Sequence, residues 1–167
     1  MATSNINYGT VTPIALSSTS LGPSPTFVAG RESTQVDNTA NEFNDVIVQG
    51  FTTTGTGPTA DKYLKLSVWG SHTSLATAPL DVLDGTDSSE TFTSVEIEAS
   101  ILTLVRSVKV NSTDDQTYYF KPFSIAQIFG EVPQFWGLFL AHDTGVALNS
   151  TPADHEFKYT GIKFDSV

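Results

Sequence analysis

The chain has 167 residues and a mass of 17.9 kDa, a length that indicates a single folded domain. Eight Lys and Arg residues against 18 Asp and Glu give a net charge of -10, which argues against nucleic acids and anionic membranes as partners, because both are bound through clustered basic residues. The absence of cysteine excludes thiol catalysis, cysteine-ligated zinc and iron–sulfur clusters.

Residues 1–44 form the first of two expected parts of the domain. They are rich in Ser, Thr, Pro and Gly, so this segment cannot bury enough apolar surface to fold alone. The first eight residues lack the basic region and apolar run of a secretory signal, so we expect synthesis in a cytoplasm. We expect residues 1–44 to form an extended N-terminal arm with entry strands, and residues 45–167 to form a sandwich that folds without residues 1–30.

From residue 45 onward the pattern is typical of strands. Leu64, Leu66 and Val68 occupy alternate positions, which predicts a strand with one buried face. Two further strands are expected within residues 10–44 and 75–98, and residues 70–94 are expected to be mainly a long polar connection. The strands with the clearest patterns span residues 45–51, 64–69, 101–110, 117–123, 134–142 and 156–164.

Strands follow strands without a long amphipathic helix between them, which predicts an all-β fold. Ser124 is placed to cap a short helix over residues 125–129, with Gly130 as the residue that ends it. We therefore expect an antiparallel β-sandwich, jelly-roll-like, with the extended N-terminal arm and at most one short helix.

Two strands carry unusual apolar patterns. Residues 135–140 are apolar at both parities, so we expect this strand to be covered on both faces, by another subunit or by the N-terminal arm. In the last strand, Phe157 and Tyr159 share one parity while Ile162 and Phe164 share the other. We expect a β-bulge at Gly161 to bring both pairs to one face.

Candidate catalytic and metal-ligating residues are sparse. His72, His142 and His155 share no local ligand spacing; a sandwich could bring two of them together, but hydrogen-bonded or solvent-facing roles are commoner for such histidines. Asp81, Asp84 and Asp87 could hold calcium through their oxygens, although Asp-Gly sequences are first of all turns.

The sequence also lacks a nucleophile elbow of the form G-x-S-x-G. We expect no enzyme, no metal and no cofactor.

Five sequence blocks resemble the capsid decoration proteins, also called cement or auxiliary head proteins, of tailed bacteriophages. Together they run through most of the chain between residues 26 and 164. The blocks are Thr26–Thr34 with Val36–Asn38, Asp81–Ser88, Thr117–Phe120, Trp136–Phe139 and His142–Ser150.

The resemblance implies a virion structural protein that is made in the host cytoplasm and decorates and stabilises the outer capsid surface. Its implied partners are the major capsid protein and further copies of itself, as a dimer or trimer. The family has no catalytic residues to carry over. The interface residues that we expect are Phe27, Arg31, Trp69 and Trp136, although a core position for Trp136 and an ion pair within the chain for Arg31 are alternatives.

Two other functions stay open from the sequence. One is a structural role in the neck, collar or tail of a phage. The other is a carbohydrate-binding β-sandwich, which an exposed coplanar pair of rings among Trp69, Trp136 and the tyrosines would favour.

Overall fold

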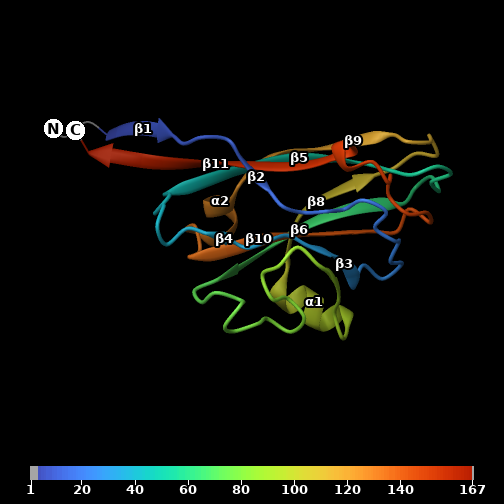
Figure 1. The fold of residues 1–167 in the computed structure, drawn as a ribbon, viewed down its shortest axis with the longest axis horizontal. Helices are drawn as coiled ribbons and strands as arrows, with labels where there is room; N and C mark the ends of the chain where they lie inside the picture. Colours follow the sequence, from blue (N-terminus) through green and yellow to red (C-terminus); the bar gives the residue numbers. More distant parts are fainter. Residues whose placement is uncertain (1–3, 167) are drawn as a thin grey trace.

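The computed structural model describes residues 4–166 and shows two antiparallel β-sheets that pack face to face (Figure 1). The antiparallel β-sandwich predicted from the sequence is thereby confirmed, while jelly-roll connectivity stays a prediction. Sheet A has the strand order β1-β11-β5-β9, with β2 also paired to β11. Its strands are β1 (Ser4–Tyr8), β2 (Thr12–Ile14), β5 (Asp45–Thr53), β9 (Thr117–Ser124) and β11 (His155–Ser166).

Sheet B has the order β7-β3-β10-β6-β8, with β4 also paired to β10. Its strands are β3 (Ala29–Glu32), β4 (Val36–Asp37), β6 (Tyr63–Ser71), β7 (Ser89–Thr91), β8 (Thr103–Lys109) and β10 (Phe135–His142). Three short helical elements join these strands: α1 (Val95–Ile101), α2 (Ile125–Phe129) and the 3-10 helix η1 (Pro152–Asp154).

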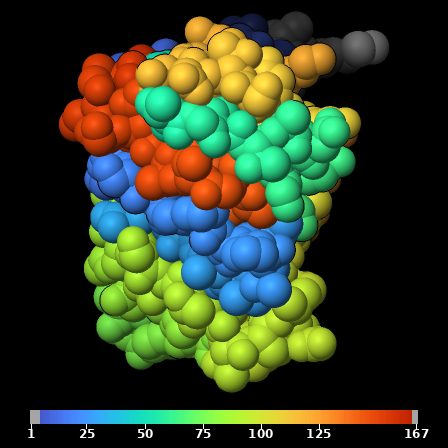
Figure 2. Space-filling view, turned by 90° about the vertical axis from the view of Figure 1, so that its right-hand side faces the viewer, coloured from blue at the N-terminus to red at the C-terminus, as the bar shows by residue number. Residues whose placement is uncertain are grey.

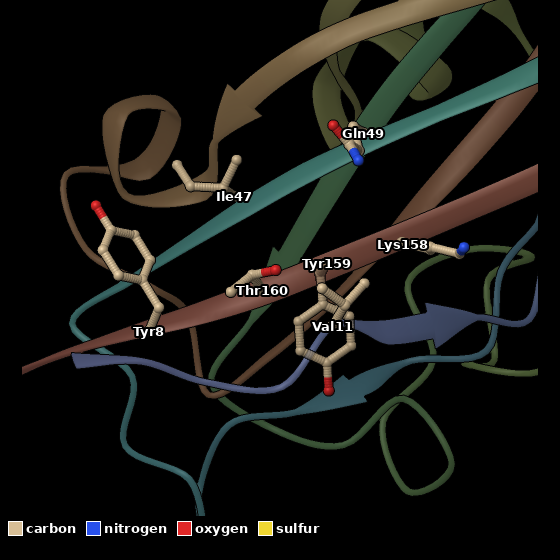
Figure 3. Close-up of a pocket in the computed structure, with 7 residues that line it drawn as sticks. All are labelled: Tyr8, Val11, Ile47, Gln49, Lys158, Tyr159 and Thr160. Atoms are coloured by element: carbon tan, nitrogen blue, oxygen red, sulfur yellow. The ribbon is translucent and has the colours of Figure 1, made fainter.

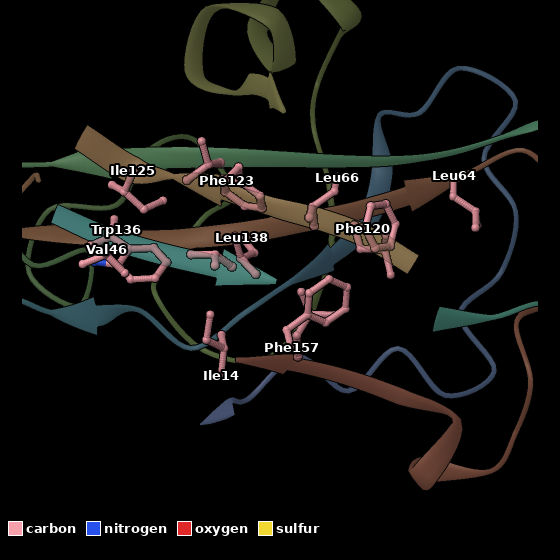
Figure 4. Packing of buried hydrophobic residues seen from close by; sticks show 14 of the residues in the cluster. Ile14, Val46, Leu64, Leu66, Phe120, Phe123, Ile125, Trp136, Leu138 and Phe157 are labelled. Carbon is pink, nitrogen blue, oxygen red and sulfur yellow. The ribbon is translucent and has the colours of Figure 1, made fainter. Parts of the chain in front are cut away.

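The main core lies between the two sheets (Figure 4). Every second residue of a strand faces it, as the alternation of Leu64 and Leu66 predicts. Phe120 and Phe157, on either side of Gly50 in sheet A, bring their ring centroids to 5.6 Å. A Cβ on Gly50 would meet the Phe157 ring at 2.4 Å, so glycine is required for these two rings to meet.

A second apolar cluster lies on the other face of sheet B. Trp69, Phe139 and Ala141 project from that face, and residues 72–102 fold over them. We call residues 72–102 the covering segment; it forms the side of the molecule opposite β9 (Figure 2). Its buried apolar residues are Leu75, Leu83, Phe92 and Leu102.

This arrangement confirms that β10 is covered on both faces. Phe27 and Val28 of the expected arm pack against the second cluster, but the covering segment supplies most of that cover. Residues 70–94 were expected to be a polar connection, and instead they supply most of the cover because single apolar side chains are spaced among their polar residues. The expectation of at most one short helix was also wrong. Besides α2, which begins at the predicted cap Ser124 and ends at Gly130, the covering segment forms α1 with Ser94 as its cap.

Residues 4–44 contribute to both sheets. Strands β1 and β2 pair with β11, whereas β3 and β4 pair with β10. Ile14 and Leu16 are buried in the main core. Most of this part is therefore integrated into the sandwich, and β1 with the end of β11 forms a two-stranded ribbon at one end of the molecule (Figure 1).

The bulge expected at Gly161 is absent from the pairing of β11 with β5, which stays in register from His155 to Ile162. Phe157 and Tyr159 face the core, so Ile162 and Phe164 lie on the opposite face of the strand. Glycine occupies position 161 because the Phe43 ring lies where a Cβ would be, at 2.4 Å. The register shift of sheet A lies instead in β5, between Val48 and Gly50.

A Gly137→Ala substitution should destabilise the protein by about 1–3 kcal/mol, because overpacking a filled core costs this much. Gly137 lies opposite Trp69 in the sheet, and an added Cβ would lie 2.5 Å from the indole ring. Gly22→Ala is the matched control, since no atom lies within 4 Å of its added Cβ. Chemical denaturation would measure both variants, and equal stability of the two would contradict the packing described here.

Deletion of residues 1–9 should leave a folded protein, whereas deletion of residues 1–30 should unfold it. The longer deletion removes β2, Ile14 and Leu16 together with the first two residues of β3. Circular dichroism and thermal unfolding would compare the two variants. A cooperative unfolding transition in the longer deletion would show that the sandwich folds without residues 1–30.

Candidate functional site

Within residues 4–166, no segment covers the outer face of sheet A, in contrast to the outer face of sheet B. Strands β9, β5 and β11 run side by side across it, and β1 extends it beyond the sandwich. We call this surface the bare face. Its exposed or half-buried residues include Ile6, Tyr8, Ile47, Gln49, Phe51, Tyr119, Lys121, Glu156, Lys158, Thr160 and Phe164.

One end of the bare face is aromatic. Tyr119, Phe51 and Glu156 are directly opposite one another on three neighbouring strands, and the first two rings have centroids 5.7 Å apart at 50°. Tyr119 is 71% exposed, the largest exposed fraction among the large hydrophobic residues of the described chain. A hollow of about 370 Å³ lies here, bordered also by Gln49 and Lys158.

A second hollow, of about 210 Å³, lies toward the β1 end of the same face (Figure 3). Gln49 and Lys158 border both hollows, so the two lie next to each other on the sheet. The residues that line the second one are Tyr8, Val11, Ile47, Gln49, Lys158, Tyr159 and Thr160.

Beyond this hollow, the β1–β11 ribbon exposes apolar side chains on both strands. Ile6 is opposite Phe164 and Tyr8 is opposite Ile162, which places all four on one face of the ribbon. Ile6, Tyr8 and Phe164 are 58%, 66% and 53% exposed. Together the two hollows and the ribbon form an extended, shallow surface with apolar ends and a polar middle.

Lysines supply the polar middle of the bare face. Lys158 pairs with Glu156 at 2.9 Å, and Lys121 is exposed on β9. The bare face therefore lacks the strong negative charge of the whole chain, which is -10. Such a face can bind apolar groups at its ends and carboxylates or carbonyls at its centre.

The two tryptophans expected at an interface are both fully buried. Trp136 lies in the main core, where its ring meets Tyr159 edge to face at 5.6 Å. Trp69 lies under the covering segment on the other face of sheet B. Neither indole is accessible to a partner in this conformation.

Arg31 and Phe27 both lie beside the covering segment. Arg31 forms an ion pair with Asp87 at 2.7 Å and also donates a hydrogen bond to the Asp87 carbonyl, which is the arrangement within the chain that the sequence left open. Partial burial alone would raise the pKa of Asp87, but hydrogen bonds from Arg31 and Ser17 outweigh it and lower that pKa. Phe27 lies half-buried beneath Lys65, whose Nζ is 3.7 Å from the ring centre.

A cluster of carboxylates holds the same loop. Atoms of Glu32, Asp84 and Glu90 lie within 4.8 Å of one another, and three such groups could coordinate a cation. Each already accepts hydrogen bonds from the loop: Glu32 from the backbone N–H groups of Asp84 and Gly85, Asp84 from Thr86, and Glu90 from Ser88. Through these hydrogen bonds the cluster attaches the covering segment to β3.

Burial raises the pKa of Glu32 to about 7, against the opposing effect of its two backbone hydrogen bonds. Asp81, Asp84 and Asp87, the aspartates considered for calcium, have separate roles. Asp81 has a left-handed backbone (φ 54°), Asp84 caps the turn at Thr86, and Asp87 pairs with Arg31.

The histidines take structural positions. His142 is fully buried between Thr144 Oγ1 and the Leu21 carbonyl, and His155 bridges Thr52 Oγ1 and the Asn149 carbonyl. Burial lowers the pKa of both imidazoles. His72 is exposed near the end of sheet B, and among residues 4–166 the histidines form no group suited to a metal ion.

Comparison of the chain with models of protein families, with curated proteins and with solved structures gave no match. Within the described part of the chain, none of the helices has the length and apolar character needed to cross a membrane.

The sequence contained the signals for the bare face, but their combination was missed. The two parities of β11 predict a bulge, but they mark the core face and the opposite face of the strand, where Ile162 is buried and Phe164 is exposed. The sequence does not single out Tyr119 among the tyrosines, because a single sequence does not show which side of β9 faces outward.

The raised pKa of Glu32 predicts that the protein loses stability as the pH rises, the opposite of the usual effect of an ion-paired carboxylate. Its folded-state pKa of about 7 lies above the ordinary value of 4.5, so the folded state binds more protons between these pH values. Stability from this group is fully present below about pH 4.5 and decreases by roughly 3 kcal/mol as the pH rises through 7. A Glu32→Gln variant should lack this loss, so its stability relative to wild type should improve with pH. Denaturation at pH 5 and pH 8 would measure this, and parallel pH profiles would contradict it.

Proposed function

We propose that this protein is a structural component of a virus particle that decorates and stabilises the outer surface of a tailed-phage capsid. The observation that carries the proposal is the asymmetry of the sandwich. Sheet B is covered by the chain's own residues 72–102, whereas the bare face of sheet A exposes aromatic and aliphatic side chains at both of its ends. Exposed apolar patches rimmed by polar residues mark sites of protein contact.

The chemistry of the bare face suits attachment to another protein surface. Tyr119, Tyr8 and Phe164 can bury large apolar areas, and aromatic residues dominate the binding energy of protein interfaces. Lys121 and Lys158 can pair with carboxylates of a capsid subunit. The hollows between them are shallow, which fits a broad contact better than an enclosed small-molecule site.

A decoration protein works through many copies. Each copy can bind weakly, because neighbouring contacts on a lattice raise the effective concentration of the others. Copies that span two capsomers would hold them together against internal pressure. The resemblance of the sequence to decoration proteins and the bare face thus point to the same mechanical role.

The carbohydrate-binding alternative draws less support from the structure. Both tryptophans that would stack on sugars are buried, and the rings of half-buried Phe51 and exposed Tyr119 are tilted by 50° instead of coplanar. A role in the neck, collar or tail of a phage would use the same bare face, and the location of the protein on the particle separates the two structural roles.

Cryo-electron microscopy of particles purified from the native source tests the proposal. Density for this chain on the outer shell, with sheet A toward the capsomers, is the expected result. Density confined to the neck or tail would move the function to the other structural role. Particles without any density for the chain would overturn both.

A Tyr119→Glu variant should bind particles at least about tenfold more weakly than wild type, because loss of an aromatic hot spot costs about 2 kcal/mol or more. Tyr119 is 71% exposed, so the variant should stay folded. Leu104→Glu is the matched control, since Leu104 is 52% exposed on β8 of the other sheet. Co-sedimentation with particles would measure binding, and equal loss in both variants would exclude the bare face as the contact.

A further inference from the structure

The strands at the sheet edges are β1, β2 and β9 in sheet A and β4, β7 and β8 in sheet B, and they differ in how they are protected against pairing with another chain. Natural proteins protect sheet edges with proline, charged residues or very short strands. In sheet A, β9 carries Lys121 and Pro122. In sheet B, β7 has three residues, and β8 carries Arg106 and Lys109.

Strand β1 has none of these protections. Its five residues, Ser4-Asn5-Ile6-Asn7-Tyr8, include no proline and no charged residue. Among residues 4–166, β11 is the strand that pairs with it, and its other edge has no strand beside it. The ribbon also lies beyond the sandwich, and an isolated two-stranded ribbon is only marginally stable in water.

The hydrogen-bonding pattern shows which backbone groups of β1 face this edge. The backbone N–H of Phe164 donates a hydrogen bond to Asn44 Oδ1, and the backbone N–H of Asn44 donates one to the Ile162 carbonyl. Phe164 and Ile162, both on β11, therefore direct these backbone groups away from β1. In an antiparallel ladder, two residues directly opposite each other either bond to each other or both direct their backbone groups outward. Ile6 and Tyr8 are opposite Phe164 and Ile162, so they also direct their N–H and C=O groups away from β11. These groups point toward the edge where a further strand would add.

We propose that β1 pairs antiparallel with β1 of a second copy of this chain, about a two-fold axis that passes beside Ile6. This register places Ile6 opposite Ile6 and Tyr8 opposite Ser4, so the backbone groups at the edge of each copy meet those of the other. The result is a continuous four-stranded sheet in the order β11-β1-β1-β11.

Two features favour a second copy as the occupant. The edge is uncharged, so the net charge of -10 on each chain places no like charges directly opposite one another. The pairing also joins the apolar faces of two ribbons, which brings both copies of Ile6 together at the centre with Tyr8 and Phe164 around them. Each ribbon thereby gains the strands that it needs for stability.

This inference deepens the proposed function, because a dimer with two bare faces can span two sites on a capsid. The dimer itself can form whether or not the protein binds capsids; only its role in bridging two capsid sites depends on the proposed function. Dimerisation is measured in solution without particles, so failure of the dimer and failure of capsid binding are distinguishable.

Sedimentation velocity of the purified full chain tests the dimer from about 10 to about 500 µM, because so small an interface gives weak affinity. Wild type should shift from monomer to dimer across this range. Ile6→Lys should stay monomeric, since it places two lysines opposite each other at the axis. Leu104→Lys, an equally exposed position on β8, should dimerise as wild type does. A wild type that stays monomeric, or a dimer that persists in Ile6→Lys, would overturn the proposal.

The absence of cysteine allows a second test with single thiols. In the proposed register the two Ile6 Cα atoms are about 5.5 Å apart, which suits a disulfide. Ile6→Cys should therefore cross-link under mild oxidation at least about tenfold faster than Tyr8→Cys or Leu104→Cys, which face no thiol. Equal rates for the three exposed thiols would show random collision and contradict this register.

Discussion

The packing of residues 72–102 onto sheet B is the interaction on which the rest of the structure depends. It makes β10 a strand with both faces buried and places Trp69 and Phe139 inside the protein. Arg31 and Glu32, neighbours on β3, fasten the same loop through Asp87 and Gly85. The polar and aromatic residues that looked available for a partner are thus occupied within the chain, and the bare face of sheet A is the surface that we propose for contacts with other molecules.

Much of this fold could be predicted from the sequence. The alternation of Leu64 and Leu66 located β6, the two-sided apolar character of residues 135–140 showed that β10 needs two covers, and Ser124 with Gly130 bounded α2. The identity of the second cover could not be predicted. Its buried apolar residues, Leu75, Leu83, Phe92 and Leu102, lie eight to ten positions apart, so no short period marks them, and only the tertiary structure brings them together.

The functional surface was harder to predict for a related reason. Strand periodicity separates two faces but does not say which of them another sheet covers. Both sets of apolar residues on β11 therefore looked like core, although Phe157 is buried and Phe164 is exposed. Burial, more than residue type, distinguishes Tyr119 from Trp136, and burial of a single aromatic residue depends on contacts between segments far apart in the chain.

The strand order has a consequence for synthesis on the ribosome. Strand β10 pairs with β3, β4 and β6, and β11 pairs with β1, β2 and β5, so the strand that joins the others in each sheet is among the last two in chain order. Until both have emerged, the nascent chain holds separate pairs such as β5–β9 and β6–β8 with no complete core. Folding must then form many contacts between segments far apart in the chain, which is slow. During translation the unpaired apolar strands stay exposed to solvent. A chaperone that holds the nascent chain until β11 is free should therefore raise the yield of folded protein.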